Sequence, residues 1–287
     1  MDGFDALLPA EIAAKAEDVG AAKAALPLVK MSVLAVLAGA FIALGANYSV
    51  VVTAGGDLPS GVSRLLAGVV FSLGLVLVVV AGAELFTGNT LLVMAYASRR
   101  IKTLALLRAW LVVYSGNFLG AAATALLVFW SGEHGQQDGL IGRRALEIAE
   151  QKSALGFREA VVLGILANVL VCLAVWLCLG ARTLIDKVAA IVLPVSAFVA
   201  AGFEHSVANM FFLPFALLVR DDGTSWSSAP IASGSIEHLT VRNLLVGNLL
   251  PVTIGNIIGG SVLVGLVYWF VYLRAAPEPG ERSSYRD

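Results

Sequence analysis

Long apolar runs without a charged side chain recur along the chain and indicate where it crosses a membrane. Five such runs contain no Asp, Glu, Lys or Arg, at residues 31–56, 65–83, 109–132, 160–181 and 243–273. Each meets or approaches the roughly 20 apolar residues that a helix needs to span a bilayer. The pattern therefore predicts five transmembrane helices.

Two apolar stretches are interrupted by an acidic residue. The run 65–83 continues beyond Glu84 through uncharged residues to Ser98, and the stretch 188–219 is interrupted at Glu204. We therefore predict an all-α integral membrane protein with six membrane elements, of which the second and the fifth are broken helices.

The sequence around both acidic residues is duplicated. Residues 81–89 read AGAELFTGN and residues 201–209 read AGFEHSVAN, which match as A-G-x-E-x-x-x-x-N. Farther along, GNFLG from Gly116 and GNIIG from Gly255 each place a Trp thirteen residues after the Asn. Two matches in the same order indicate that one half of the chain repeats the other.

Each copy contains three spans, an odd number, so the second copy must enter the membrane from the opposite side. We predict two inverted repeats, residues 29–132 and 156–274, within a six-span domain of residues 29–274. In transporters built this way, the site lies near the midplane at corresponding interrupted helices. Their N-termini direct unpaired N–H groups and positive dipole ends toward an anion.

Polar side chains at both breaks are expected to hold the broken ends. A glycine two residues before each acid supplies backbone freedom. Glu84 and Glu204 can accept hydrogen bonds from N–H groups that a break leaves unpaired, and Asn89 and Asn209 can link the ends to neighbouring segments. The alternative is that both acids pair with Lys or Arg at a misplaced membrane boundary.

Composition agrees with a membrane protein. The chain is 59% hydrophobic and 14% charged, with a mean hydropathy of +0.87, whereas soluble proteins are about 25% charged. The net charge of −1 provides no basic surface for nucleic acid, so nucleic acid is excluded as a partner.

Lys and Arg in the connections predict the orientation in the membrane. The connection between the second and third elements holds Arg99, Arg100, Lys102 and Arg108, whereas the one between the first and second holds only Arg64. Because short cytoplasmic loops carry the excess of Lys and Arg, both termini are predicted to be cytoplasmic.

Both ends of the chain are expected outside the membrane. Residues 1–28 form a cytoplasmic region in which residues 6–24 suit an amphipathic surface helix, with Pro9 tolerated in its first turn. The region lacks the basic start and apolar core of a secretory signal. Residues 275–287 are expected to form a cytoplasmic tail.

His205 marks the place where the two copies differ in chemistry. Repeat one has Leu85 at the corresponding position, and repeat two has Val207 where repeat one has Thr87. A histidine inside a membrane is unfavourable unless it faces partners or water, so we predict a functional role, with a structural hydrogen-bonding role as the alternative.

Metal binding and catalysis are not indicated by the sequence. Apart from the adjacent Glu204, no His, Cys or carboxylate stands at a spacing that would complete a metal site with His205. No nucleophile motif, phosphate loop or dinucleotide fingerprint occurs. We predict a conduit rather than an enzyme, without a cofactor. His134 and His238 lie in external connections and are expected to be solvated.

Four segments, AELFTGNT, NVLVCLAVW, GFEHSVANM and PVTIGNIIGG, resemble the formate/nitrite transporter family, and most of all its formate channels. The resemblance covers nearly the whole chain. It implies an aquaporin-like protomer, assembled as a homopentamer in a bacterial inner membrane, with one pore through each protomer. The family's central His and the Thr that faces it map onto His205 and Thr87.

The resemblance also assigns residues along the pore. The apolar constrictions of the family map onto Phe71, Leu75, Leu85, Phe86, Phe198 and Phe203. Its polar support maps onto Lys152, Asn168, Glu204, Asn209 and Asn256. Without the resemblance, core packing would be the expectation for the six apolar residues, because an apolar residue in an apolar helix is not distinctive.

The implied function is a channel for small monovalent anions, foremost formate, with nitrite and hydrosulfide as alternatives that the sequence does not separate. Apolar rings exclude an anion unless central groups lower its energy. Burial and positive helix ends disfavour the imidazolium form of His205, whereas an arriving anion favours it. We hypothesise that His205 is neutral in the empty pore and relays a proton to a bound weak-acid anion.

Two functions from other classes remain open. A neutral-solute or water channel would need a continuous polar stripe, which the apolar rings argue against, and swelling in glycerol would reveal it. A membrane scaffold with merely structural polar residues would behave independently of anions in proteoliposomes.

Overall fold

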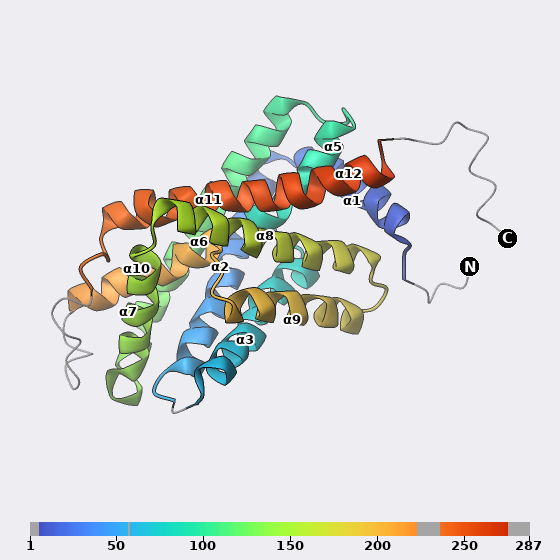
Figure 1. Ribbon diagram of the computed structural model, residues 1–287. Coiled ribbons are helices and arrows are strands. Elements are labelled where there is room, and N and C mark those ends of the chain that lie inside the picture. The colour runs from blue at the N-terminus through green and yellow to red at the C-terminus, as the bar shows by residue number, and fades with distance from the viewer. Residues whose placement is uncertain (1–5, 57, 223–235, 275–287) are drawn as a thin grey trace, which may run out of the picture.

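Long helices form the body of the protein in the computed structural model, which describes residues 6–56, 58–222 and 236–274 (Figure 1). Five helical stretches in this part of the chain are long and apolar enough to span a membrane. They are α2 (Leu28–Thr53), α3 (Ser60–Ala81), α6 (Thr103–Trp130), α8 (Phe157–Gly180) and a last one comprising η4 (Asn243–Leu249), α11 (Leu250–Ile257), η5 (Ile258–Leu266) and α12 (Val267–Tyr272). They coincide with the five uninterrupted runs of the sequence.

The second and fifth membrane elements are broken, as predicted. The first break follows α3, and the chain resumes as α4 (Phe86–Asn89), η1 (Thr90–Leu92) and α5 (Val93–Ala97). The second lies between α9 (Leu184–Ala200) and α10 (Ser206–Asp222). Gly82 and Gly202 have φ of 83° and 74°, the left-handed region that glycine adopts without a steric penalty.

Two further helices accompany the halves. Helix α1 (Pro9–Ala24) begins beside the end of α8, where the N–H of Leu7 donates to the carbonyl of Gly180 at 3.2 Å. Helix α7 (Leu140–Ser153), after the short η2 (Glu133–Gly135) and η3 (Gln137–Gly139), begins beside the end of α2, where Leu140 packs against Gly55. The two helices thus occupy corresponding places, although the ranges 29–132 and 156–274 leave both out.

Helix α1 is amphipathic and packs on the membrane body through its buried Ile12, Ala13 and Ala16. The proposed tail, residues 275–287, and residues 1–5 lie outside the described residues.

The duplicated G-N-x-x-G segments bring pairs of helices into close contact. A Cβ at Gly120 of α6 would lie 1.9 Å from the carbonyl oxygen of Val36 in α2, and one at Gly259 would lie 2.3 Å from that of Ile165 in α8. Only glycine permits such approach, as in small-xxx-small contacts between membrane helices. In Figure 1, α11 accordingly runs along α8. The inverted repeats therefore share their packing as well as their sequence.

Candidate functional site

An asparagine in each half anchors the helix that follows the break. Asn117 on α6 accepts the N–H of Phe86 at 2.8 Å and donates to the carbonyls of Ala35 and Glu84 at 2.7 and 2.9 Å. Asn256 makes the same three bonds in the second half. Its partners are the N–H of Ser206 and the carbonyls of Gly164 and Glu204, at 2.9, 2.8 and 3.0 Å. These bonds satisfy an N-terminal donor that each break leaves unpaired.

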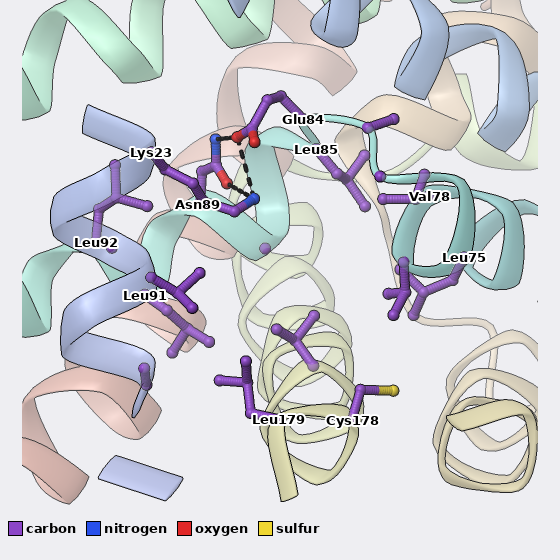
Figure 2. Close-up of a pocket in the computed structure, with 18 of the residues that line it drawn as sticks. Lys23, Leu75, Val78, Glu84, Leu85, Asn89, Leu91, Leu92, Cys178 and Leu179 are labelled. Atoms are coloured by element: carbon purple, nitrogen blue, oxygen red, sulfur yellow. Dashed lines mark hydrogen bonds and ion pairs between the residues drawn. The ribbon is translucent and has the colours of Figure 1, made fainter. Parts of the chain in front are cut away.

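A partly buried ion pair holds the first break. The Nζ of Lys23 on α1 lies 3.1 Å from Oε2 of Glu84 and 3.1 Å from Oδ1 of Asn89 (Figure 2). Asn89 in turn donates through Nδ2 to Oε2 of Glu84 at 2.7 Å. The carboxylate is thus paired with the side chain of a helix that the sequence pattern placed on the surface.

The second break has the same arrangement, except that its lysine does not bond the asparagine side chain. The Nζ of Lys152 on α7 lies 2.7 Å from Oε1 of Glu204, and Asn209 donates to Oε2 of Glu204 at 2.6 Å. Asn209 also donates to Asn248 at 2.7 Å. The expectation that both acids accept backbone N–H groups at the breaks was therefore wrong, whereas the alternative pairing with lysine is found, at the breaks themselves. Their carboxylates accept from lysine and asparagine side chains, while the backbone N–H groups of Phe86 and Ser206 are met by asparagines on α6 and α11.

Thr87 and His205 meet where the N-terminal ends of α4 and α10 come together. Thr87 Oγ1 lies 2.9 Å from His205 Nε2, and the N–H of Ala208 donates to His205 Nδ1 at 3.1 Å. Because Nδ1 accepts, the proton of the neutral ring sits on Nε2, which donates to Thr87. The hydroxyl hydrogen of Thr87 is then left to donate to a molecule in the pore. His205 also caps its own helix by accepting from the third residue of α10.

Two cavities approach this pair from opposite sides. The first, of about 300 Å³, is lined by Lys15, Lys23 and Lys187, and we name these three lysines the lysine mouth. The cavity reaches Leu75 and Leu85, which Figure 2 shows together with Lys23. The lysines surround a cavity whose inner end is apolar.

The second cavity, of about 170 Å³, reaches Phe71, Phe198, Phe203 and His205 and continues outward into a third of about 530 Å³. Arg64, Arg143 and Arg144 line the outer part, and we name them the arginine mouth. Cationic side chains thus line both approaches to the Thr87–His205 pair.

The predicted constriction residues divide between the two sides, with one exception. The rings of Phe71 and Phe198 pack edge to face at 5.8 Å, and Phe198 stacks on His205 at 5.9 Å. Phe86 lines neither cavity. Its ring instead contacts Trp110 and Tyr114 of α6 edge-on, at 6.4 and 4.9 Å. An aromatic residue at the start of α4 therefore packs against α6.

Asn168 ties the centre together from α8. Its Nδ2 lies 2.6 Å from the carbonyl of Asn256, 3.1 Å from Oγ1 of Thr90 and 3.3 Å from the carbonyl of Thr87. The backbone that carries Thr87 is thereby fixed to two helices of the second half. Asn168 supports the position of Thr87 without lining either cavity.

The two remaining histidines differ in their exposure to solvent. His238 is exposed and pairs with Glu150 of α7 at 2.7 Å. His134 is only 7% exposed and stacks on Phe129 at 4.7 Å, with its Nε2 3.5 Å from Asp222. The expectation that His134 is solvated was wrong, because the connection after α6 folds back onto that helix.

Comparison with known proteins identifies the architecture. The family model "Formate/nitrite transporter" matches residues 10–270. The chain belongs to the formate/nitrite transporter family. This confirms the resemblance seen in the sequence and the prediction of a membrane transporter rather than an enzyme.

Members of the formate/nitrite transporter family match over almost their full length. The formate channel FocA of Escherichia coli K12 is 48% identical over 274 residues, covering 94% of this chain and 96% of FocA. The formate channel FocB of the same strain is 39% identical over 280 residues, covering 96% and 98%. A solved structure described as a pentameric formate channel with formate bound has a TM-score of 0.80 at 42% identity, covering 86% of this chain and 98% of that one.

Sequence reasoning missed three side chains at the site: Lys23, Asn117 and Asn248. The internal repeat held the signal for two of them. GNFLG aligns Asn117 with Asn256, and KAALP from Lys23 aligns with KSALG from Lys152. Nothing comparable marks Asn248, which donates to the carbonyl of Lys152 at 2.9 Å.

Proposed function

We propose that this protein is a channel for small monovalent anions, with formate as its foremost substrate and one pore in each protomer. The observation that carries the proposal is the buried Thr87–His205 pair, which offers hydrogen-bond donors between two cavities with cationic mouths. The names of FocA and of the pentameric formate channel support formate and a homopentamer.

The apolar residues account for selectivity in this proposal. Leu75 and Leu85 on one side and Phe71 and Phe198 on the other leave no polar atoms to replace the hydration shell of an ion. Narrow apolar segments dewet and so form a barrier to hydrated ions. A small anion that reaches the centre accepts a hydrogen bond from the hydroxyl of Thr87, and a second from Nε2 of His205 once it displaces that hydroxyl, which lowers the barrier for anions alone.

Proton relay by His205 has a structural requirement. An imidazolium carries a proton on both ring nitrogens, so Nδ1 would lose the hydrogen bond from Ala208 and would place positive charge at the N-terminus of α10. An anion at Nε2 offsets that unfavourable interaction. We therefore propose that protonation of His205 accompanies arrival of the anion and does not precede it.

The setting of the channel is part of the proposal. The charge pattern of the connections supports both termini inside, so that α1 lies on the cytoplasmic side. The similarity to a formate channel of Escherichia coli supports a bacterial cytoplasmic membrane. Nitrite and hydrosulfide are alternative substrates of similar size and charge. A neutral-solute channel is disfavoured because the apolar residues interrupt any polar path between the two cavities.

The test is flux through purified protein in proteoliposomes. Formate is expected to cross, to be slowed by competing nitrite or hydrosulfide according to their relative affinities, and to far exceed glycerol in a swelling assay. Glycerol permeation equal to that of formate would refute the anion channel, and a lack of flux for every anion would favour a scaffold.

A further inference from the structure

The two mouths carry different cationic groups. Lys15 and Lys23 of α1 correspond to Arg144 and Lys152 of α7, since AEDVGAAK before α2 aligns with ALEIAEQK before α8. A further cation at each mouth comes from the start of a neighbouring helix. It is Lys187 of α9 at the lysine mouth and Arg64 of α3 at the arginine mouth. Guanidinium groups therefore occur on one side only.

Arg64 and Arg144 stand where the outer cavity passes into the inner one. Both residues, together with Thr53 and Gln151, line the outer cavity of about 530 Å³ and the inner cavity of about 170 Å³. The inner cavity leads to Phe198, so these arginines lie outside the apolar constriction. A molecule held between them would obstruct the path without entering the pore.

A carboxylate already occupies part of this mouth. Glu147 places Oε1 at 3.1 Å from Nε of Arg143 and Oε2 at 3.3 Å from Nη1 of Arg144. Arg144 also donates through Nε to Thr53 at 3.2 Å. Arg64 is exposed and makes no hydrogen bond or ion pair with a side chain in residues 6–56, 58–222 or 236–274. One guanidinium therefore lines the cavity without a side-chain partner in the described part of the chain.

Arginine and lysine recognise carboxylates differently. The planar guanidinium presents a rigid fork of donors that matches both oxygens of a carboxylate, whereas the ammonium of lysine acts as a compact, strongly hydrated point charge. The lysine mouth attracts anions through charge alone, while the arginine mouth is able to hold a carboxylate in a defined geometry. The outer cavity also has room for molecules larger than formate.

We propose that Arg64 and Arg144 form a carboxylate-binding site at the arginine mouth, outside the constriction, which takes small organic dicarboxylates too large to pass. A bound dicarboxylate bridges the two guanidinium groups and blocks the channel. The blocking effect rests on the proposed function as an anion channel, whereas the binding does not.

Two measurements with malonate test the proposal. Purified protein in detergent is expected to gain thermal stability as malonate is added, and formate flux in proteoliposomes with malonate on both faces is expected to fall. Arg64→Gln and Arg144→Gln should each raise the half-maximal malonate concentration by about tenfold in both assays, as for loss of one charge-assisted hydrogen bond. Arg144→Lys should behave like Arg144→Gln, because it keeps the charge but loses the fork.

Arg158→Gln is the matched control, because Arg158 is exposed on α8 and lines none of these cavities. Its malonate response should equal that of wild type. Equal responses of wild type, Arg64→Gln and Arg144→Gln would overturn the site, as would a full malonate response in Arg144→Lys. If malonate stabilises wild type but no anion crosses, the proposed channel function fails and the binding site stands. If formate crosses and malonate has no effect in either assay, the binding site fails and the channel function stands.

Discussion

The two breaks in the membrane have the same frame but different linings. Both start at a left-handed glycine, and both are anchored by an asparagine from the last span of their own half. At the next positions the copies diverge, since Leu85 in one half corresponds to His205 in the other, and Thr87 to Val207. The duplication thus preserved the parts that hold a broken helix, while the residues that face the pore became free to differ.

The ion pairs that brace the breaks differ in how completely water is excluded. The side chains of Lys23 and Glu84 are 31% and 8% exposed, whereas those of Lys152 and Glu204 are 16% and 5% exposed. Lys23 also bonds Asn89, while Lys152 lies over the ring of Phe212 at 5.5 Å. Loss of the acid should therefore be more harmful in the second half than in the first.

The largest effect is expected from Glu204→Ala. Removing one partner of a buried ion pair leaves an uncompensated charge and destabilises by about 3–5 kcal/mol, so little assembled protein should survive extraction into detergent. The destabilisation by Glu84→Ala should be smaller, because Lys23 keeps its hydrogen bond to Asn89 and is more exposed to water. Thermal melting followed by size-exclusion chromatography measures both variants. The double variant Lys152→Met, Glu204→Gln should recover much of the loss, and a lower melting temperature for Glu84→Ala than for Glu204→Ala would contradict the comparison.

The apolar residues on the two sides of the Thr87–His205 pair can be compared in the same way. Phe198→Ala removes a ring that contacts both Phe71 and His205, whereas Leu75→Ala removes a smaller side chain on the lysine side. We expect the acetate-to-formate flux ratio to rise by about tenfold for Phe198→Ala, within the range for a pocket that changes by a few methylenes, and by less for Leu75→Ala.

Phe86→Ala serves as the control for this series. It removes an equally large buried ring that packs against α6 and lines neither cavity. It should lower the melting temperature and leave the flux ratio unchanged. A similar ratio change in Phe86→Ala and Phe198→Ala would show that the constriction is assigned to the wrong residues.

The spans and the breaks were predictable because ionisable residues are rare within membrane-spanning segments, so each one that occurs there marks a special position. Glu84, Glu204 and His205 stood out in apolar sequence for that reason. The partners of the acids were not predictable from local pattern, since Lys23 lies 61 residues before Glu84 and belongs to a helix that reads as a surface element. An alignment of the two halves would have identified Lys23 as the counterpart of Lys152.

The orientation of apolar side chains was the least predictable feature. Phe86 and Phe198 both lie in apolar surroundings, yet Phe86, at the start of the helix after the first break, packs against α6, whereas Phe198, near the end of the helix before the second break, lines the cavity. Position along an apolar helix does not reveal which neighbour a ring will meet. Family resemblance supplied the six constriction residues together, and the packing separates Phe86 from the other five.

The smallest change in flux is expected from His205→Asn, which isolates the chemistry that distinguishes the second break from the first. Asparagine is a favoured N-cap, so its Oδ1 can accept the N–H of Ala208 in place of the ring nitrogen, and its Nδ2 remains as a donor toward the pore. The amide does not ionise near neutral pH. Formate flux at pH 7.5 should therefore stay within a few-fold of wild type.

The pH dependence of that flux is what should change. Between about pH 5 and pH 8, a range that brackets the unperturbed histidine pKa of about 6.5, relay through His205 makes wild-type flux rise toward acid pH. The His205→Asn profile, normalised to its own maximum, should be flat. His238→Asn is the matched control, because this exposed histidine pairs with Glu150 away from both cavities and should keep the wild-type profile. Superimposable profiles for wild type and His205→Asn would leave His205 as a neutral donor to the anion, whereas loss of flux at every pH would mean that the anion requires its positive charge.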